Sequence, residues 1–426
     1  MLVEFRVKNF RSFKDEQVLS MVAAPGDDSL PENVHRGQVN LLKSAAIYGP
    51  NASGKSNLIR AMRVMQNIIS DSASYKPNES LPVKPFALSS QCISEPSEFE
   101  VTFILNESVF QFGFSATKVK VVEEWLYETP LNRKRRSQRQ LYVRSQSDKG
   151  DWNMNSRHLS GQKSAIAKKT RPNALFLSVA AQWNHELLTK LYDWFTSSLI
   201  LYLADDEIMP VTKDHCLNSS NFKASVIQML NHVDLGIENM SISLREVDNS
   251  EMVKYFVEDY REKFMTFYRG QEGYTVNFQH RNRITDEIGD ISLEDESDGT
   301  KRYFDLIGPW SMALNDGNCL LIDELDRSLH PHLIRHLLFT FNSHYANPTG
   351  AQLLFSTHDT TLLNSELLRR DQIWFTEKGS EGSTSFFSLA DFKGVRKEES
   401  FQKGYLAGRY GALPIIESFE LTEKKD

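Results

Sequence analysis

Residues 49–56 read Gly-Pro-Asn-Ala-Ser-Gly-Lys-Ser, and this stretch sets the fold class of the chain. It fits the phosphate-binding loop pattern G-x-x-x-x-G-K-[S/T] at every fixed position. Glycine at both ends lets the backbone curl until its N–H groups point inward at phosphate oxygens. Lys55 then reaches the β- and γ-phosphates, and the Ser56 hydroxyl holds Mg²⁺. The predicted nucleotide-binding residues of this stretch are Gly49, Asn51, Ser53, Gly54, Lys55, Ser56 and Asn57.

The flanks of this loop have the pattern that a phosphate-binding loop requires. Residues 43–48 predict a buried strand that enters the loop. Apolar side chains follow at helical spacing, at Leu58, Met62, Met65 and Ile69. They predict an amphipathic helix whose N-terminus faces the phosphates. The alternative, a glycine-rich turn arising by chance, does not account for this strand and helix.

Composition is that of an ordinary globular protein. The chain has 426 residues, of which 40% are apolar and 25% charged, enough for one large or two moderate domains. Cys92, Cys216 and Cys319 lack metal-ligand spacing, which is typical of reduced thiols in the cytosol. Residues 1–10 alternate like a strand and lack an apolar signal-peptide core. No apolar run reaches the roughly 18 residues that span a bilayer, so we expect a cytoplasmic protein without a membrane partner.

A second motif supplies the acidic half of a nucleotide site. Residues 318–324 read Asn-Cys-Leu-Leu-Ile-Asp-Glu, an apolar strand followed by two carboxylates. Open α/β sheets bind ligands at the carboxyl ends of their strands. Asp323 is predicted to ligate Mg²⁺, directly or through water, and Glu324 to accept a proton from the attacking water. The alternative is a strand that ends in a solvated acidic turn.

Two weaker signals flank this strand. Residues 297–302, Ser-Asp-Gly-Thr-Lys-Arg, precede a predicted helix, so that the Ser297 hydroxyl and the Gly299 N–H group could face a γ-phosphate. An ordinary helix N-cap is the alternative. Residues 352–359 predict another apolar strand, which ends near His358. We expect His358 to sense the γ-phosphate, although a histidine at a strand end is often structural.

The middle of the chain changes in pattern. Short alternating runs at 98–105, 109–114 and 119–122 predict an antiparallel sheet. Residues 172–235 look helical, and residues 245–282 are charged and mixed without a clear pattern. The predicted core stripe of the helical part is Phe176, Val179, Trp183, Leu187, Leu191 and Trp194. Gly308-Pro309 predicts a kink in the helix that follows residues 297–302.

A basic cluster, Arg-Lys-Arg-Arg-Ser-Gln-Arg, occupies residues 133–139. The net charge of the chain, −7, argues against a protein coated all over in nucleic acid, but it leaves room for a local basic face. The cluster is therefore either a solvated hairpin tip or a contact for nucleic acid or a partner protein.

Together these motifs resemble the ABC-type ATPases of the RecF/SMC/OLD branch. Residues 297–302 are similar to the signature loop of that class, residues 328–331 stand where its D-loop is found, and His358 matches its switch histidine. Residues 8–13, Lys-Asn-Phe-Arg-Ser-Phe, look like its N-terminal strand-turn near the nucleotide. Gln91 is the nearest candidate for the remaining element, a Gln loop.

A narrower similarity is to the stand-alone bacterial AAA family ATPases of Rlo, Abi, Septu and PARIS type. It implies an ATPase subunit of a defence system against phage. The strings that carry it are residues 176–178, 323–331, 370–375 and 405–412.

The resemblance implies an α/β fold, an ABC-type P-loop ATPase with a parallel-containing core sheet. We expect this core to comprise residues 1–80 and 290–426, with an antiparallel β lobe and basic hairpin at 81–171 and a helical or mixed insertion at 172–289. It also implies ATP and Mg²⁺ as cofactors, and a homodimer or higher homo-oligomer. In that assembly, Ser297 and Gly299 of one subunit would meet the phosphate-binding loop of another across ATP.

Absent features narrow the expected role. The chain lacks the sustained heptad pattern that would predict the coiled coil of SMC proteins. The residues after His358 are too few for the nuclease domain of OLD proteins. We expect the chain to hydrolyse ATP without cutting nucleic acid, and to control a separately encoded nuclease or toxin. The alternatives are a RecF-like DNA-repair ATPase that clamps DNA and an ATP-binding scaffold with little turnover.

Overall fold

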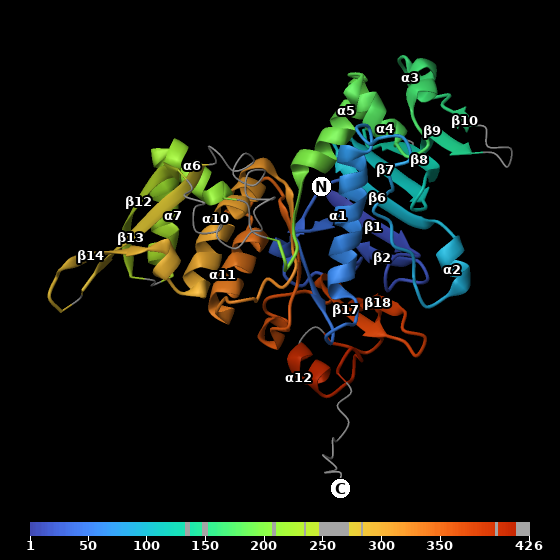
Figure 1. Ribbon diagram of the computed structural model, residues 1–426. Helices are drawn as coiled ribbons and strands as arrows, with labels where there is room; N and C mark the ends of the chain where they lie inside the picture. Colours follow the sequence, from blue (N-terminus) through green and yellow to red (C-terminus); the bar gives the residue numbers. More distant parts are fainter. Residues whose placement is uncertain are drawn as a thin grey trace, which may run out of the picture. The chain divides into compact units, whose positions relative to one another are not determined.

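The computed structural model of the chain describes residues 1–132, 137–146, 152–206, 210–233, 236–246, 272–282, 284–396 and 399–414 (Figure 1). The chain forms two compact units. The first comprises Met1–Asp206, Met312–Arg327 and Ile334–Asp426, and the second Glu207–Ser311 and Ser328–Leu333.

A six-stranded sheet of order β11-β15-β16-β5-β17-β18 lies in the first unit. Its strands are β5 (Ser44–Tyr48), β11 (Leu199–Tyr202), β15 (Cys319–Ile322), β16 (Gln352–Ser356), β17 (Ile373–Lys378) and β18 (Thr384–Ser388). All neighbouring pairs are parallel except β17 and β18, which are antiparallel. Every residue of β5, β15 and β16 is buried, as in parallel strands that are covered on both faces. The predicted parallel-containing sheet is therefore confirmed, and it gains β11 from the segment in which the sequence indicated helices.

The predicted antiparallel sheet is also present, with seven strands in the order β10-β9-β8-β7-β6-β1-β2. They are β1 (Leu2–Lys8), β2 (Gln17–Ser20), β6 (Ser97–Leu105), β7 (Ser108–Ala116), β8 (Val121–Pro130), β9 (Arg139–Gln146) and β10 (Trp152–Asn155). The N-terminal strands join it through the pairing of β1 with β6. A two-stranded ribbon, β3 (Val34–His35) and β4 (Leu41–Leu42), completes the strands of this unit.

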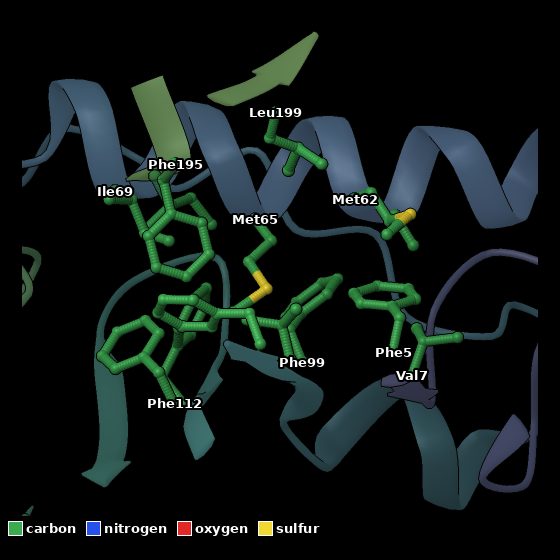
Figure 2. Close-up of a cluster of buried hydrophobic side chains, with 14 of the residues drawn as sticks. Phe5, Val7, Met62, Met65, Ile69, Phe99, Phe112, Phe195 and Leu199 are labelled. Carbon is green, nitrogen blue, oxygen red and sulfur yellow. The ribbon is translucent and has the colours of Figure 1, made fainter. Parts of the chain in front are cut away.

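Helix α1 (Lys55–Asp71) packs its apolar face against the antiparallel sheet. Leu58, Met62, Met65 and Ile69 are buried, as their spacing predicts. Figure 2 shows three of them in one cluster with Phe5, Val7, Phe99 and Phe112 of the sheet and with Phe195 and Leu199. Truncating one such buried side chain to alanine typically costs about 2–5 kcal/mol. Packing on this scale fixes the helix that begins at the phosphate-binding loop.

The other helices of the first unit are short. They are α2 (Ser90–Ser94), α3 (Lys163–Lys169), α4 (Phe176–Gln182), α5 (Glu186–Asp193) and α12 (Phe401–Leu406). Single turns are η1 (Pro31–Asn33), η2 (Trp194–Ser198), η4 (Thr360–Leu362), η5 (Arg370–Gln372) and η6 (Leu389–Asp391). None of the helices in the described part of the chain combines the length and apolarity that crossing a membrane requires.

The core stripe predicted for residues 172–235 is right except at its centre. Phe176, Val179, Leu191 and Trp194 are buried, and Leu187 is half-buried against the same core. Trp183 is instead 54% exposed, and the Lys169 Nζ lies 3.4 Å from the centroid of one of its rings. The reason is that α4 ends at Gln182, so that Trp183 caps the helix and leaves its buried face.

A buried ion pair anchors α4 to the antiparallel sheet. Glu124 and Arg144 are both almost fully buried, with 3.7 Å between carboxylate oxygen and guanidinium nitrogen. The Glu124 carboxylate accepts hydrogen bonds from the N–H groups of Phe176 and Leu177 and from the Tyr142 hydroxyl. Burial raises the pKa of Glu124, while Arg144 and these donors act against that rise. Because a buried charge without partners is costly, the network specifies where the helix begins.

The second unit holds a three-stranded antiparallel sheet of order β12-β13-β14. Its elements are α6 (Val211–Asn218), α7 (Ser220–His232), β12 (Ile237–Glu246), β13 (Glu272–Arg281), β14 (Ile288–Ser292), η3 (Leu293–Asp295) and the first part of α10 (Asp298–Asp316). Helices α10 and α11 (Pro331–Asn342) both continue into the residues of the first unit. The segment 245–282, which had no clear sequence pattern, supplies the end of β12 and all of β13. Its residues 247–271 lie outside the described residues.

Helix α10 runs through Pro309 without interruption. A proline inside a helix has no N–H group for the carbonyl four residues earlier, which here is that of Asp305. The Thr212 hydroxyl donates to this carbonyl at 2.9 Å, and its oxygen accepts the Gly308 N–H at 2.8 Å. Gly308 makes the approach feasible, since a Cβ there would lie 2.6 Å from the Thr212 nitrogen. The Gly-Pro pair thus docks α6 on α10.

Candidate nucleotide site

The phosphate-binding loop joins β5 to α1 at the carboxyl edge of the six-stranded sheet, as predicted from the sequence. Both glycines of the phosphate-binding loop pattern have positive φ, +152° at Gly49 and +115° at Gly54. A Cβ at Gly49 would lie 2.5 Å from the Thr376 carbonyl oxygen, and one at Gly54 would lie 2.8 Å from the Thr384 Cγ2. Only glycine fits either position, because β17 and β18 press directly on the loop.

Side chains that are distant in sequence hold this loop in shape. The Ser53 and Thr376 hydroxyl oxygens lie 2.5 Å apart, and the Thr384 hydroxyl donates to the Ser53 carbonyl at 2.6 Å. The Asn57 amide donates to the Ser12 hydroxyl at 2.8 Å. Residues 8–13 therefore lie beside the start of α1, where the resemblance places them.

Lys55 is buried within the loop, with 6% of its surface exposed. Its Nζ donates to the carbonyl oxygens of Gly49 at 2.8 Å and Pro50 at 3.1 Å. Burial lowers the pKa of Lys55, whereas the charges of Asp323 and Glu324 act to raise it. A phosphate in the loop would restore the stability of the charged amine and give it a stronger acceptor than a carbonyl.

Asp323 directly follows β15 and is fully buried. Its Oδ1 accepts a hydrogen bond from the Ser356 hydroxyl at 2.5 Å. Its Oδ2 is buried and has no hydrogen-bond partner among the described residues. An unsatisfied buried carboxylate oxygen is costly, and an oxygen ligand of this kind suits Mg²⁺. Asp323 and the Ser56 hydroxyl are the residues that would hold the ion, with phosphate and water completing its shell.

Glu324 turns away from the line of the strand. Its φ of +52° is in the left-handed region, which is uncommon for a residue other than glycine. The Ser356 hydroxyl oxygen accepts the Glu324 N–H at 2.8 Å, and the Glu324 carbonyl accepts the Arg327 N–H at 3.0 Å. Such strained residues are frequent at functional sites. The positive φ of Glu324 therefore ends the extended backbone of the strand between the two adjacent acidic residues.

His358 lies two residues beyond β16 and is exposed. The backbone N–H of His358 donates to the Asp326 Oδ2 at 3.0 Å. Partial burial and the Lys55 charge lower the pKa of His358, and the carboxylates of Asp326, Glu324 and Asp323 act in the opposite direction. The ring is therefore mainly neutral near neutral pH, when it can donate one hydrogen bond and accept another.

Ser356 is one of the residues of this site that sequence reasoning missed, together with Thr376 and Thr384. Ser356 is fully buried, and its one hydroxyl contacts Asp323 and the backbone of Glu324 together. Nothing in the pattern of residues 352–359 distinguishes it from an ordinary strand serine. Its role follows from the parallel pairing of β15 with β16.

Two predicted residues, Ser297 and Gly299, lie in the second unit. The Ser297 side chain is exposed and caps α10, accepting the Thr300 N–H at 3.1 Å. A Cβ at Gly299 would lie 2.8 Å from the carbonyl oxygen of Ser328, in the segment expected to form a D-loop. Glycine here therefore permits the close approach of residues 328–331 to the helix start.

The remaining predicted residues are less informative. Asn51 is exposed and Ser56 is half-buried in the first turn of α1. Gln91 is exposed on α2 and donates to Glu95 at 2.8 Å, and no hydrogen bond among the described residues joins it to the phosphate-binding loop. Of the basic cluster 133–139, the first four residues lie outside the described part of the chain. The described residues contain no group of three or more His, Cys, Asp or Glu side chains arranged to hold a metal without phosphate and water.

The solved structures that are similar to this chain include two of low sequence identity. The chain is similar to a crystal structure of the Smc head bound to the C-winged helix domain of ScpA, with 11% identity, a TM-score of 0.37, and coverage of 91% of this chain and 97% of that chain. It is also similar to the recombination mediator protein RecF-ATPrS, with 14% identity, a TM-score of 0.34, and coverage of 91% and 98%. At these scores neither similarity bears on what this chain does.

No curated protein sequence matches the chain. A family model described as "AAA domain, putative AbiEii toxin, Type IV TA system" matches residues 44–211 and 237–364, which include the phosphate-binding loop, the acidic pair and His358. These two ranges make up more than half of the chain, and the chain therefore belongs to this AAA domain family.

Proposed function

We propose that this protein binds ATP with Mg²⁺ and hydrolyses it to ADP and phosphate. One observation carries the proposal: at a single sheet edge in the first unit, Lys55, Asp323 with its unsatisfied oxygen, and Glu324 on a strained turn follow β5 and β15. Each has the chemistry that one step of phosphoryl transfer to water needs.

In this proposal the residues act in turn on the bound phosphates. Loop N–H groups and Lys55 bind the β- and γ-phosphates, and Ser56 and Asp323 hold Mg²⁺, which neutralises phosphate charge. Glu324 accepts the proton of the water that attacks the γ-phosphorus, while the bond to the β-phosphate oxygen breaks. His358 hydrogen-bonds the γ-phosphate through its neutral ring.

We infer that the active site is completed by a second subunit. Ser297 is exposed at the N-terminus of α10, a helix of 19 residues, where a hydroxyl, N–H groups and the helix dipole together favour an anion. Across ATP, Ser297 and Gly299 of one subunit would meet the loop of another. ATP would then close a homodimer or larger homo-oligomer, and hydrolysis would open it.

For the biological role we propose a cytoplasmic ATPase sensor or scaffold that controls a separately encoded nuclease or toxin in defence against phage. The family description, which names a toxin of a toxin–antitoxin system, supports this direction. A RecF-like ATPase that clamps DNA is the second candidate, favoured by the concentration of lysine and arginine in residues 131–171. Co-purification from the native operon, with and without ATP, separates the two: an effector protein supports the first, and DNA alone supports the second.

The Glu324→Gln variant tests the enzymatic part. The amide cannot take the proton from water, while Asp323 keeps its place, so ATP should still bind but turnover should fall about 10²–10⁴-fold. The matched control is Glu366→Gln, the same change at an exposed position of the first unit. Turnover is measured by phosphate release and binding by nucleotide titration. Near-normal turnover in Glu324→Gln would place the general base elsewhere.

A further inference from the structure

Positive charge is concentrated in one segment of this acidic protein. Residues 131–171 contain twelve lysine and arginine residues and two aspartates, whereas the whole chain has a net charge of −7. The described parts of the segment, 137–146 and 152–171, contain no acidic residue. The rest of the chain is correspondingly acidic, so the charge is segregated rather than balanced locally.

This segment occupies one edge of the antiparallel sheet. Strand β10 is the edge strand, β9 lies next to it, and α3 follows β10 along the chain (Figure 1). The next strand inward, β8, carries Glu123, Glu124 and Glu128. Across the sheet, acidic side chains therefore first occur on β8, the strand next to the basic segment.

Several of these cations have structural roles. Arg144 is buried against Glu124, and Arg139 pairs with Glu128 at 2.7 Å. Lys163 donates to the Leu159 carbonyl at 2.7 Å. Arg171 donates to the carbonyl of Ala73 at 2.9 Å. These four stabilise the fold: carboxylates balance the charges of Arg139 and Arg144, and backbone carbonyls hold Lys163 and Arg171 in place.

The others face solvent. Arg157, Lys168 and Lys169 are exposed and form no ion pair with any described residue. His158 is exposed beside Arg157. Lys169 lies over the ring of Trp183, which is itself 54% exposed. These five residues constitute what we call the basic surface.

We propose that the basic surface binds the phosphate backbone of a nucleic acid. Lys168 and Lys169 are adjacent in the chain, so their charges repel each other, and a polyanion relieves that repulsion. The exposed neighbours are hydroxyl and amide side chains, such as Asn155, Ser160 and Gln162, which commonly contact phosphate and sugar oxygens. The exposed face of Trp183 offers a platform on which an unpaired base can stack.

An acidic protein is the competing polyanion. Protein interfaces are usually centred on several apolar anchors in a desolvated patch. Here Trp183 is the one large exposed apolar side chain among the described residues of 152–183. The polar, cationic character of the surface therefore favours nucleic acid. This inference goes beyond the proposed ATPase and does not depend on it.

The test is binding of labelled single-stranded and duplex DNA and of RNA by fluorescence anisotropy, without nucleotide. Wild type is compared with Lys168→Glu/Lys169→Glu. The control is Lys393→Glu/Lys403→Glu, which changes the net charge equally at exposed positions elsewhere in the first unit. Thermal melting verifies that both variants are folded, and ATP turnover is measured separately so that failure of the ATPase proposal is distinguishable.

We expect the control to bind like wild type and Lys168→Glu/Lys169→Glu to bind at least about tenfold more weakly, with the salt dependence of binding reduced by about one unit per lysine. Equal binding by both variants would overturn the proposal, as would the absence of wild-type binding at low salt. Polyglutamate of matched charge that binds as tightly as DNA would also overturn it, in favour of an acidic protein partner.

Discussion

At the residue scale, the site depends on a hydroxyl group that carries no charge. Ser356 joins the Asp323 carboxylate to the backbone of Glu324, with contacts of 2.5 Å and 2.8 Å. It thereby fixes which Asp323 oxygen has a hydrogen-bond partner and which has none among the described residues. Residues that orient metal ligands in this way commonly change metal affinity about 10–100-fold when they are removed.

We therefore predict that Ser356→Ala raises the Mg²⁺ concentration needed for half-maximal ATP turnover by about tenfold or more. The matched control is Ser44→Ala, which removes another fully buried hydroxyl from the neighbouring strand, where it donates to the Asn342 side chain at 2.8 Å. Both variants should lose some thermal stability. A Mg²⁺ dependence that is equally shifted in both, or in neither, would argue against the positioning role of Ser356.

Residue patterns predicted the parts of the site that are contiguous in sequence. One short motif contains Gly49, Gly54, Lys55 and Ser56, and the acidic residues Asp323 and Glu324 after β15 are adjacent. Ser356, Thr376 and Thr384 could not be found in this way, because each approaches the loop or the acidic pair only after the strands have paired. The pressure of β17 and β18 on the loop glycines is likewise a tertiary effect.

At the scale of elements, α10 shows how a local rule is satisfied by a distant partner. The sequence indicated a disturbance at Gly308-Pro309, and the helix is nevertheless continuous. The Thr212 hydroxyl of α6 donates to the Asp305 carbonyl, which Pro309 cannot do, and it accepts the Gly308 N–H. No pattern within α10 itself could have predicted this partner.

This arrangement predicts a coupling between two substitutions in the second unit. Thr212→Val should lower the free energy of unfolding by about 1–3 kcal/mol, because it leaves the partly buried Asp305 carbonyl unpaired. With Pro309→Ala in place, the helix supplies its own N–H to that carbonyl, and the same Thr212→Val change should cost about 1 kcal/mol less. Denaturant unfolding of the four proteins measures the coupling. Strictly additive losses would contradict it.

Another element-scale contact links the end of α11 to the start of β5. The Lys43 amine is buried and donates to the carbonyl oxygens of Asn342 and Ser343, each at 3.2 Å, and lies 3.0 Å from the His344 Nδ1. Burial lowers the pKa of Lys43 from 10.5 to about 8. The unfolded chain then binds more protons than the folded one between about pH 8 and pH 10.5, and stability rises with pH in that window.

We predict that the unfolding free energy of wild type, relative to that of Lys43→Met, increases by up to about 3 kcal/mol from pH 8 to pH 10. The difference between the two proteins removes the contribution of tyrosines and cysteines that titrate in both. A difference that is constant across this range, or that falls with pH, would mean that Lys43 keeps an ordinary pKa in the folded protein.

At the scale of the whole molecule, the sequence predicted both sheets but not all the strands that belong to each. Strand β11 is only four residues long, between a helical turn and a loop, and pairs with β15, which lies more than a hundred residues away. Strand β1 pairs with β6 and so belongs to the antiparallel sheet, not to the six-stranded sheet that leads into the phosphate-binding loop. Such pairings are decided by tertiary packing, which a local period of two cannot specify.

In the proposed assembly, one subunit's phosphate-binding loop works with another subunit's α10. Two defective variants test it. Lys55→Ala lacks the phosphate-binding amine. Ser297→Asp keeps an oxygen that can cap α10 but places a carboxylate where the γ-phosphate would lie. It is preferable to a bulky residue at Gly299, which would collide with Ser328 of its own chain. Each variant alone should be folded and nearly inactive.

The decisive measurement is ATP turnover of an equal mixture of the Lys55→Ala and Ser297→Asp proteins after subunit exchange. Mixed dimers contain one intact site built from two chains, so the mixture should recover about a quarter of wild-type turnover. We expect this recovery, and we expect Glu324→Gln introduced into the Ser297→Asp chain to abolish it. A mixture no more active than its components, together with full turnover by a strictly monomeric wild-type protein, would show that the site is not shared between subunits.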